Sequence, residues 1–422
     1  MKSSGADHRT QWQPPPRPEW VQRVNEEGYC MNVRAVVPLD AQSLLDCAMR
    51  TTGLEDFGAD DWQEPFEKLA HAMDEEADLN LIGRLRTRSE LLQLLEARLR
   101  IEATYKEHPE IENERIVQPI IIVGQGRSGT TFLNNLLAAN PDNGALMQWE
   151  ATFPCPPPEA ATYRTDTRIE RAHQLIDQWN RVTPTLPSMH DFSGSVPMED
   201  CQIIALNFTA PSWFGSLGQV ASYDAYIATL DAARVLSYHQ RVLKLLQWKN
   251  PRRHWVLKDP IHLDRLQALL RIYPDACFVW PHRDPVRALA SMVDLIGTIQ
   301  WGRSDHPFKD GAFDFVVDPV LSARRLNAAI EVIESGVVPK RQFHNLLYAD
   351  LVRDPLGAVR KMYAHFGIPL SERGIEGMAA YLRERPREAR PVHHFSAGSP
   401  EATARARDAY RRYQDHFHIP SE

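Results

Sequence analysis

A glycine-rich loop follows a run of apolar residues in the segment PIIIVGQGRSGTTFLNNLL, which covers residues 119–137. The apolar run predicts a buried strand, and the apolar residues after the loop recur at helical spacing. Gly124, Gly126 and Gly129 let backbone N–H groups point into one concavity, and the following helix adds its free N–H groups and positive dipole end. The segment is therefore expected to bind an anion.

Three other kinds of loop share parts of this pattern. The segment satisfies G-x-G-x-x-G, the dinucleotide fingerprint in which Glu150 would bind the ribose, but NPDNGALMQWE lacks the β-rich run that such an acid needs. The P-loop of nucleoside triphosphatases requires Lys where this chain has Thr130. A turn without a ligand is disfavoured because an Arg, a Ser and two Thr crowd the helix N-terminus. The residues favour an anion loop that contains its own cation, Arg127.

Two more predicted strands end in basic residues. WVLKDPIHL places Lys258 at the end of one strand, and CFVWPHRDPVRALAS places Arg283 just beyond another. Ligands of parallel sheets lie outside the carboxyl ends of the strands, so Arg127, Lys258 and Arg283 are expected to converge on one crevice. Ser291, two turns into the helix after Arg283, is placed to add a hydroxyl. A ligand with two separated anionic groups is implied.

The elements that must position these residues are those of a parallel α/β sheet flanked by helices, because short apolar runs alternate with helical stretches from residue 116 onward. An irregular and helical insertion, dense in Pro and aromatic residues, is expected at about 150–250. The predicted strands are Ile120–Val123, Trp255–Leu257, Cys277–Trp280 and about 343–347.

The N-terminal part of the chain has a different pattern. Residues 1 to about 35 contain a proline-rich run and are expected to form an extended arm, and residues 36–115 are expected to be helical. A leucine stripe with arginines on its flanks favours packing of the last helix on the α/β region, with membrane-surface contact or dimerisation as the alternative. The three predicted helices run from Asp40 to Gly53, from Asp60 or Asp61 to about Glu75, and from Leu79 to about Tyr105.

Composition excludes several classes of protein. The 422 residues carry 48 Lys and Arg against 55 Asp and Glu, a net charge of −7, which disfavours nucleic acid as a partner. No stretch approaches the roughly 20 apolar residues of a membrane span, and no signal-peptide core is present, so a cytoplasmic protein is expected. The five widely spaced cysteines contain no CxxC pair, which predicts reduced thiols and no metal site.

Three motifs together resemble those of PAPS-dependent sulfotransferases. GRSGTTFL is similar to the family's 5′-phosphosulfate loop, HRDPVRALAS to its 3′-phosphate motif, and YADLVRDP at 348–355 to its Tyr-Glu-Asp-Leu-like segment. The resemblance covers about 116–370, and the helical region before it is similar to a bacterial group of the family. It implies a P-loop-like parallel sheet flanked by helices, distantly similar to nucleotide kinases, with residues 116–422 as the sulfotransferase domain.

The resemblance also implies roles for individual residues. Arg283 and Ser291 would bind the 3′-phosphate, and Tyr348 would lie near the adenine. Arg127, where the cytosolic enzymes usually have Lys, and the KDP segment beginning at Lys258 are similar to the tyrosylprotein branch. The residues implied to bind the 5′-phosphosulfate are Gln125, Gly126, Arg127, Ser128, Gly129, Thr130 and Thr131.

The implied reaction moves a sulfuryl group from PAPS to a hydroxyl by in-line displacement. Arg127 and Lys258 would stabilise the sulfuryl and leaving oxygens without a metal. Glu150, which resembles a glutamate of the tyrosylprotein branch, is the first candidate for the general base, although a buried ion pair is its alternative role. His262 is the second candidate, four residues beyond Lys258 where the cytosolic branch has two.

The acceptor is expected to be a small, lipophilic alcohol or phenol. Aromatic side chains concentrate in the insertion that should cover the crevice, although core packing explains them nearly as well. A P-loop nucleotide kinase-like phosphotransferase, which would need ATP and Mg²⁺, is the alternative enzyme. A nucleotide-binding module without turnover is the alternative of another class.

Overall fold

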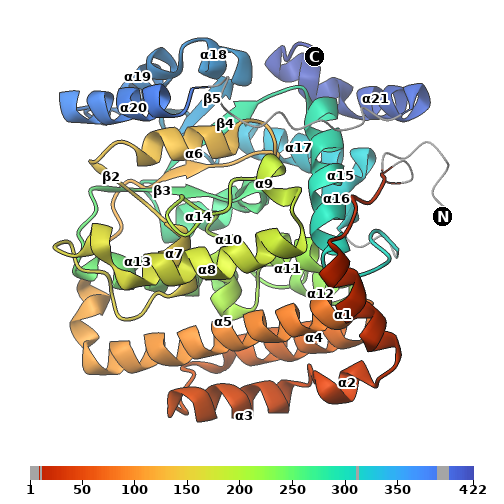
Figure 1. Ribbon diagram of the computed structural model, residues 1–422. Coiled ribbons are helices and arrows are strands. Elements are labelled where there is room, and N and C mark those ends of the chain that lie inside the picture. The colour runs from red at the N-terminus through yellow and green to blue at the C-terminus, as the bar shows by residue number, and fades with distance from the viewer. Residues whose placement is uncertain (1–8, 10–11, 310–312, 387–398) are drawn as a thin grey trace.

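The computed structural model describes residues 9, 12–309, 313–386 and 399–422. A five-stranded sheet with strand order β2-β3-β1-β4-β5 lies in the upper half of Figure 1, and every neighbouring pair is parallel. This confirms the predicted fold class. The strands are β1 (Ile120–Ile122), β2 (Asn143–Ala145), β3 (His254–Lys258), β4 (Cys277–His282) and β5 (Phe343–Leu347).

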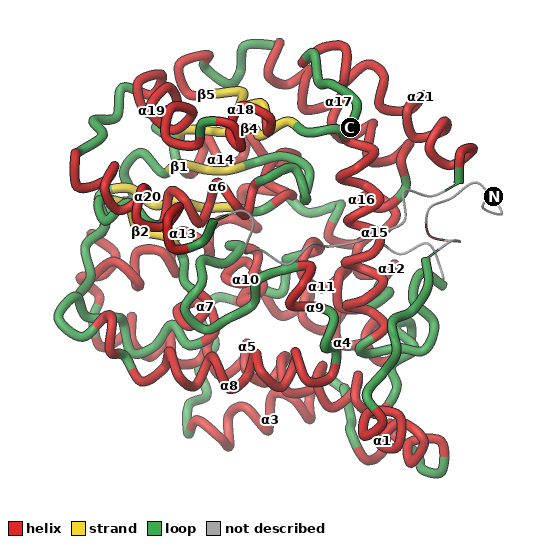
Figure 2. Tube along the Cα trace, turned by 45° about the horizontal axis from the view of Figure 1, so that its top comes forward, coloured by secondary structure: helices red, strands yellow, loops and turns green. Residues whose placement is uncertain are grey.

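Helices cover both faces of the sheet, as Figure 2 shows from above. On one face, Ile120 and Ile122 pack in a cluster with side chains of α6 (Thr130–Ala138) and α19 (Pro355–Phe366). On the other, Ile121 packs in a cluster with side chains of α13 (Ala232–Trp248), α14 (Leu266–Ile272) and α17 (Pro319–Glu334). Because successive strand residues point to opposite faces, a strand covered on both sides is apolar throughout, as this one is.

The three predicted N-terminal helices are confirmed. Asp40 accepts a hydrogen bond from Ser43 N at the start of the first, which ends at Gly53 with a φ of 68°. Leu95 and Leu99 of the third are fully buried in the cluster that contains Ile121, whereas Leu85 of the predicted stripe is 47% exposed. The helices are α3 (Ala41–Thr52), α4 (Gln63–Glu75) and α5 (Leu81–Glu107).

The expectation of an extended arm over residues 1 to about 35 is wrong where α1 (Glu19–Tyr29) and α2 (Val33–Val36) form. Proline fixes its own φ but permits a helix directly after it, and Pro18 is the N-cap of α1. Asn25 on the buried side of α1 accepts a hydrogen bond from Ile82 N at 3.1 Å. Residues 1–8, 10 and 11 of the expected arm lie outside the described residues.

The expected insertion forms many short helices below the sheet (Figure 1). The N-terminal helices and the sheet share one buried cluster, so the core is not divided at residue 116. The domain boundary expected there stays a prediction. No helix in the described ranges is long and apolar enough to cross a bilayer. The remaining helices are α7 (Gln148–Thr152), α8 (Thr167–Val182), α9 (Leu186–Met189), α10 (Cys201–Ile204), α11 (Pro211–Leu217), α12 (Ala221–Ile227), α15 (Pro285–Trp301), α16 (Asp314–Val317), α18 (Tyr348–Arg353), α20 (Glu372–Glu384) and α21 (Pro400–Phe417).

Candidate active site

The glycine loop connects the end of β1 to the start of α6. Gly124 and Gly129 have φ values of 117° and 98°, which side chains rarely adopt. A Cβ atom on Gly129 would lie 2.6 Å from Cδ2 of Tyr348, so the ring lies directly against the loop. Gly129, the N-cap of α6, has no side chain with which to cap the helix, whose N-terminus carries the positive end of the helix dipole.

Four of the predicted donor-site residues meet beside this loop. Arg127, at a φ of 68°, donates from Nε to Ser291 Oγ at 2.9 Å and from Nη1 to Met189 O at 2.8 Å. Arg283, which follows β4, donates from Nη1 to Arg127 O at 3.3 Å and lies 4.6 Å from the centre of the Tyr348 ring. The loop, α15 and the ends of β4 and β5 thus contribute to one cationic cluster.

Arg283, one of these cations, forms an ion pair with the carboxylate of Glu422. Arg283 donates from Nε to Glu422 Oε1 at 2.9 Å and from Nη2 to Glu422 Oε2 at 2.7 Å, a two-point arrangement that a phosphate can also accept. Arg283, Tyr348, Arg353 and Glu422 border a cavity of about 420 Å³. This cavity has the size and the charged wall that a nucleotide needs.

Lys258 ends β3 and is almost fully buried. Its Nζ contacts a carboxylate oxygen of Glu199, and its backbone N–H donates a hydrogen bond to Asp200 Oδ1 at 2.9 Å. Asp200 Oδ2 accepts hydrogen bonds from Nε2 of His262 at 2.6 Å and of His239 at 2.9 Å. Burial opposes the charged form of Asp200, but the two histidines outweigh it and hold the pKa of Asp200 well below its usual range.

This buried carboxylate and its two histidines also have the proximity that a metal site requires, with one ligand atom each within 4.8 Å of the others. Both Nε2 atoms, however, are hydrogen-bonded to the same carboxylate oxygen. His239 Nδ1 is in turn 2.8 Å from the hydroxyl of Tyr273. Hydrogen bonding therefore accounts for this arrangement, which fixes the carboxylate behind Lys258.

A cavity of about 120 Å³ opens directly on the glycine loop. The residues that line it include Gly124–Arg127, Thr130 and Thr131 of the loop region together with Glu199 and His190 of the insertion. Burial and the nearby Lys258 lower the pKa of His190 to about 4, so this imidazole is neutral at pH 7. Burial opposes a charged Glu199, but Lys258 and His190 outweigh it and lower its pKa.

The two bases proposed from the sequence do not line this cavity. Glu150 is fully buried, contacts Arg252, and accepts a hydrogen bond from Met147 N at 3.0 Å. Burial raises the pKa of Glu150. Burial also works against a charged His262, but Asp200 outweighs it and raises the His262 pKa.

Sequence reasoning missed the residues that take their places. Glu199 and His190 belong to the irregular part of the insertion, where neither strand ends nor a motif marks them. The remaining loop residues lie as predicted in the turn, where Ser128 Oγ donates to Gln125 O at 2.6 Å.

A model of the sulfotransferase family matches residues 119–372, which include the loop, Lys258, Arg283 and Tyr348. The omega-hydroxy-beta-dihydromenaquinone-9 sulfotransferases Stf3 of Mycobacterium bovis and Mycobacterium tuberculosis are each 27% identical over 285 residues, which is 63% of this chain and 67% of theirs.

Two solved structures have the same fold. Sulfotransferase STF1 of Mycobacterium tuberculosis H37Rv is 27% identical, with a TM-score of 0.71 over 88% of this chain and 98% of that one. Sulfotransferase STF9 of Mycobacterium avium is 24% identical, with a TM-score of 0.77 over 91% of this chain and 98% of that one. Both alignments extend beyond the 254 matched family residues into the N-terminal helices, since they cover about nine-tenths of the chain.

Proposed function

Since this chain belongs to the sulfotransferase family, we propose that it transfers a sulfuryl group from PAPS to a hydroxyl of a small, lipophilic alcohol or phenol. The observation that carries the proposal is the cluster of Arg127, Ser291, Arg283 and Tyr348 beside a glycine loop that leads into a helix N-terminus without a side-chain cap. It offers two separate anion-binding places, and PAPS has two separate anionic groups. The stacked ring of Tyr348 lies between them, against the loop.

The donor would be bound along this cluster. The amides of the loop and Arg127 would hold the 5′-phosphosulfate, because oriented N–H groups and a helix N-terminus favour negative charge. The 3′-phosphate would replace the Glu422 carboxylate on Arg283. Ser291, whose Oγ accepts a hydrogen bond from Arg127 Nε, would contribute its hydroxyl to the same phosphate. The adenosine would then occupy the cavity that Tyr348 and Arg353 border.

Lys258 is proposed to neutralise the charge that grows on the bridging oxygen as PAP leaves. Its ammonium group is held at the carboxyl end of β3, one strand away from the loop. A cation fixed in this way stabilises the transition state without having to reorganise during the reaction. Its ion pair with Glu199 keeps the side chain near the cavity before the donor binds.

For the proton of the acceptor, His190 is a better-supported base than Glu150 or His262. It lines the loop cavity, and contact with the main chain of Asp191 at Nδ1 orients the ring so that Nε2 can accept a proton. The pKa of His190 is low partly because Lys258 and Arg127 are nearby. Bound phosphosulfate would offset both cations and make the imidazole a stronger base.

The acceptor would enter through the apolar part of the same cavity, where Phe192, Trp213 and Ile261 lie. The Stf3 relatives are sulfotransferases of an omega-hydroxylated dihydromenaquinone, which supports a lipid-like alcohol or phenol as the acceptor of this chain as well. Apolar walls with a few polar groups at the reacting end are typical of sites for such molecules.

Transfer of labelled sulfate from PAPS to a phenol, followed by identification of the sulfate ester, tests the proposal. PAP and ATP are titrated separately, each with and without Mg²⁺. Metal-independent binding of PAP together with sulfate transfer supports a sulfotransferase. Preference for ATP with Mg²⁺ would instead indicate a phosphotransferase, and PAP binding without transfer to any acceptor would indicate a module without turnover.

A further inference from the structure

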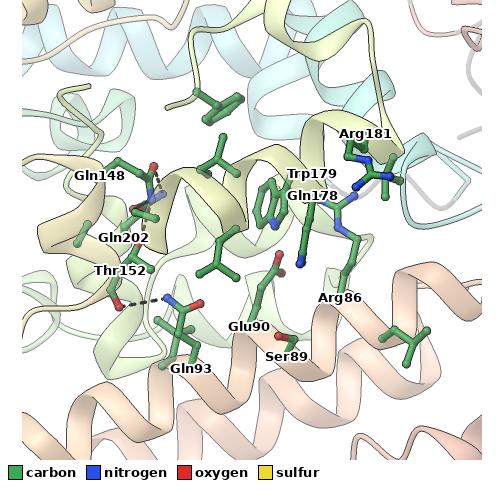
Figure 3. A pocket seen from close by; sticks show the side chains of 18 of the residues that line it. Arg86, Ser89, Glu90, Gln93, Gln148, Thr152, Gln178, Trp179, Arg181 and Gln202 are labelled. Atoms are coloured by element: carbon green, nitrogen blue, oxygen red, sulfur yellow. Dashed lines mark hydrogen bonds between the residues drawn. The ribbon is translucent and has the colours of Figure 1, made fainter. Parts of the chain in front are cut away.

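A second cavity, of about 460 Å³, lies between α5 and α8 (Figure 3). Phe192 and Trp213 line both this cavity and the smaller one at the glycine loop. The two cavities are therefore neighbours that share a wall, and the wall is aromatic. Whatever extends from the loop past these two rings enters the space between the helices.

Apolar side chains line much of this cavity, and polar side chains lie at its ends and, in Glu90 and Gln178, between them (Figure 3). Gln148 and Gln202 are hydrogen-bonded to each other at one end, and Arg86 lies at the other, where Trp179 is 4.5 Å from its guanidinium (Figure 3). Apolar side chains from both helices also line the cavity. These apolar side chains are Ile82, Leu85 and Leu94 of α5 and Ala172, Leu175 and Ile176 of α8.

The space continues into a third cavity of about 570 Å³. Leu175, Thr152 and Gln93 line both, and the third cavity reaches Arg168 and Arg100. α8 therefore borders the combined space from Val182 to Arg168. At 1.5 Å of rise per residue this part of the helix is about 21 Å long. We call the two cavities between α5 and α8 the interhelical trough.

We propose that the interhelical trough binds an elongated apolar chain of the acceptor, whose hydroxyl end passes between Phe192 and Trp213 to the glycine loop. This inference rests on the proposed sulfuryl transfer and names the acceptor class as a long-chain lipid alcohol or alkylphenol. A small phenol would fill only the space at the loop, whereas the cavity of about 460 Å³ extends the same site with apolar side chains of α5 and α8, and polar and charged side chains line the third cavity beyond it. Leu85 lines the trough and is 47% exposed, and an apolar chain bound in the trough would bury part of this exposed surface.

The physical basis is burial of the chain. Each methylene transferred from water into an apolar site improves binding roughly fourfold. Seven additional methylenes would give more than 10³-fold if all were buried, so incomplete burial still leaves a gain on the order of 100-fold. A site limited to the space at the loop would show no such gain with chain length.

The experiment compares 4-methylphenol with 4-octylphenol as acceptors at saturating PAPS. In the wild-type protein, kcat/KM is expected to be about 100-fold higher for 4-octylphenol. Leu175→Trp on α8 and Leu85→Trp on α5 fill the trough from opposite walls at positions that are not fully buried. Both are expected to remove the gain for 4-octylphenol and to leave turnover of 4-methylphenol within about twofold, because they are remote from the loop.

Asp177→Trp is the matched control, since Asp177 is exposed on α8 and does not line the trough. It should keep the full chain-length gain. Equal kcat/KM for the two phenols in the wild type, or a gain that survives both trough variants, would overturn the inference. If neither phenol is sulfated, the proposed function fails. Calorimetric titration of 4-octylphenol into the PAP-bound protein and into its Leu175→Trp variant then tests chain binding in the trough separately. Binding to the wild type alone supports the inference, and no binding overturns it.

Discussion

Asp200 and Lys258 are joined by two hydrogen bonds, from Asp200 N to Lys258 O at 3.1 Å and from Lys258 N to Asp200 Oδ1 at 2.9 Å. Asp200 belongs to the insertion and Lys258 ends β3. The pair therefore fixes the insertion to the carboxyl ends of the strands, where ligands are expected. The other carboxylate oxygen of Asp200 holds His262 and His239. Asp200 thus acts as a buried positioning residue for Lys258.

Asp200→Asn is expected to destabilise the protein by about 3–5 kcal/mol at pH 7, because it leaves buried histidines without their charged partner. The pKa of Asp200 is lowered in the folded state, so its contribution is present above the unfolded pKa of about 4 and is lost as the pH falls. Urea unfolding of both proteins at pH 7 and pH 4 measures this. The difference should largely persist at pH 4, because the folded pKa lies well below the unfolded one and the contribution is lost only as the pH falls further. Asp177→Asn, at an exposed position, should change neither value.

Arg283→Ala is expected to weaken binding of PAP by about 10- to 100-fold, because a charge-assisted two-point contact is lost. Binding of AMP, which has no 3′-phosphate, should change by less than about twofold. Calorimetric titration of both nucleotides measures the two effects. Equal weakening for PAP and AMP would remove Arg283 from the 3′-phosphate site.

Glu422→Gln should change PAP binding in the opposite direction. The Glu422 carboxylate occupies Arg283 and must be displaced by a phosphate. Because the ion pair is partly exposed and such pairs contribute little, the expected gain in PAP affinity is only about twofold to fivefold. The gain should disappear in the Arg283→Ala background, which a double-mutant cycle detects.

Lys258→Ala is expected to lower kcat by about 10²–10³, because it removes the cation that we propose neutralises the charge on the leaving oxygen. PAPS affinity should fall much less, since the interaction strengthens only as charge develops. Single-turnover rates and PAPS titrations separate the two quantities. A variant with normal turnover and poor PAPS binding would assign Lys258 to binding alone.

His190→Asn is expected to slow the chemical step by about 10²–10⁴ for acceptors of high pKa, and less for phenols already ionised at the assay pH. The wild-type rate should fall at low pH as the imidazole is protonated, at or above the pKa of about 4 that it has without donor. Single-turnover rates across a phenol series measure both. Glu150→Gln and His262→Asn are the controls, and a larger defect in either than in His190→Asn would return the base role to that residue.

The strand ends could be predicted from the sequence because each consists of a short apolar run followed by polar or basic residues. This pattern indicates Arg127 and Arg283, the position in the helix after Arg283 indicates Ser291, and the resemblance adds Tyr348. Their mutual contacts depend on the strand order, in which β1 lies between β3 and β4, whereas the resemblance implied only that the sheet is parallel.

The other half of the site could not be found by pattern. Glu199 and His190 lie in irregular chain, whose path is determined by tertiary contacts such as the hydrogen bonds between Asp200 and Lys258. The sequence indicates Glu150 by its distance from the loop. Its burial against Arg252 depends on how the insertion folds, which no sequence pattern shows. The three-residue strand β2 was missed because it contains Asn and Gly, which have little preference for strands.

The common core of α5 and the sheet region restricts how this architecture can be divided. Leu95 and Leu99 occupy the same buried cluster as Leu206 and Tyr238 of the insertion. A fragment that began after α5 would leave those partners exposed as an apolar patch prone to aggregation. The N-terminal helical region therefore folds as one unit with the rest of the chain. A chimera that exchanges this region between relatives has to exchange the facing helices of the insertion as well.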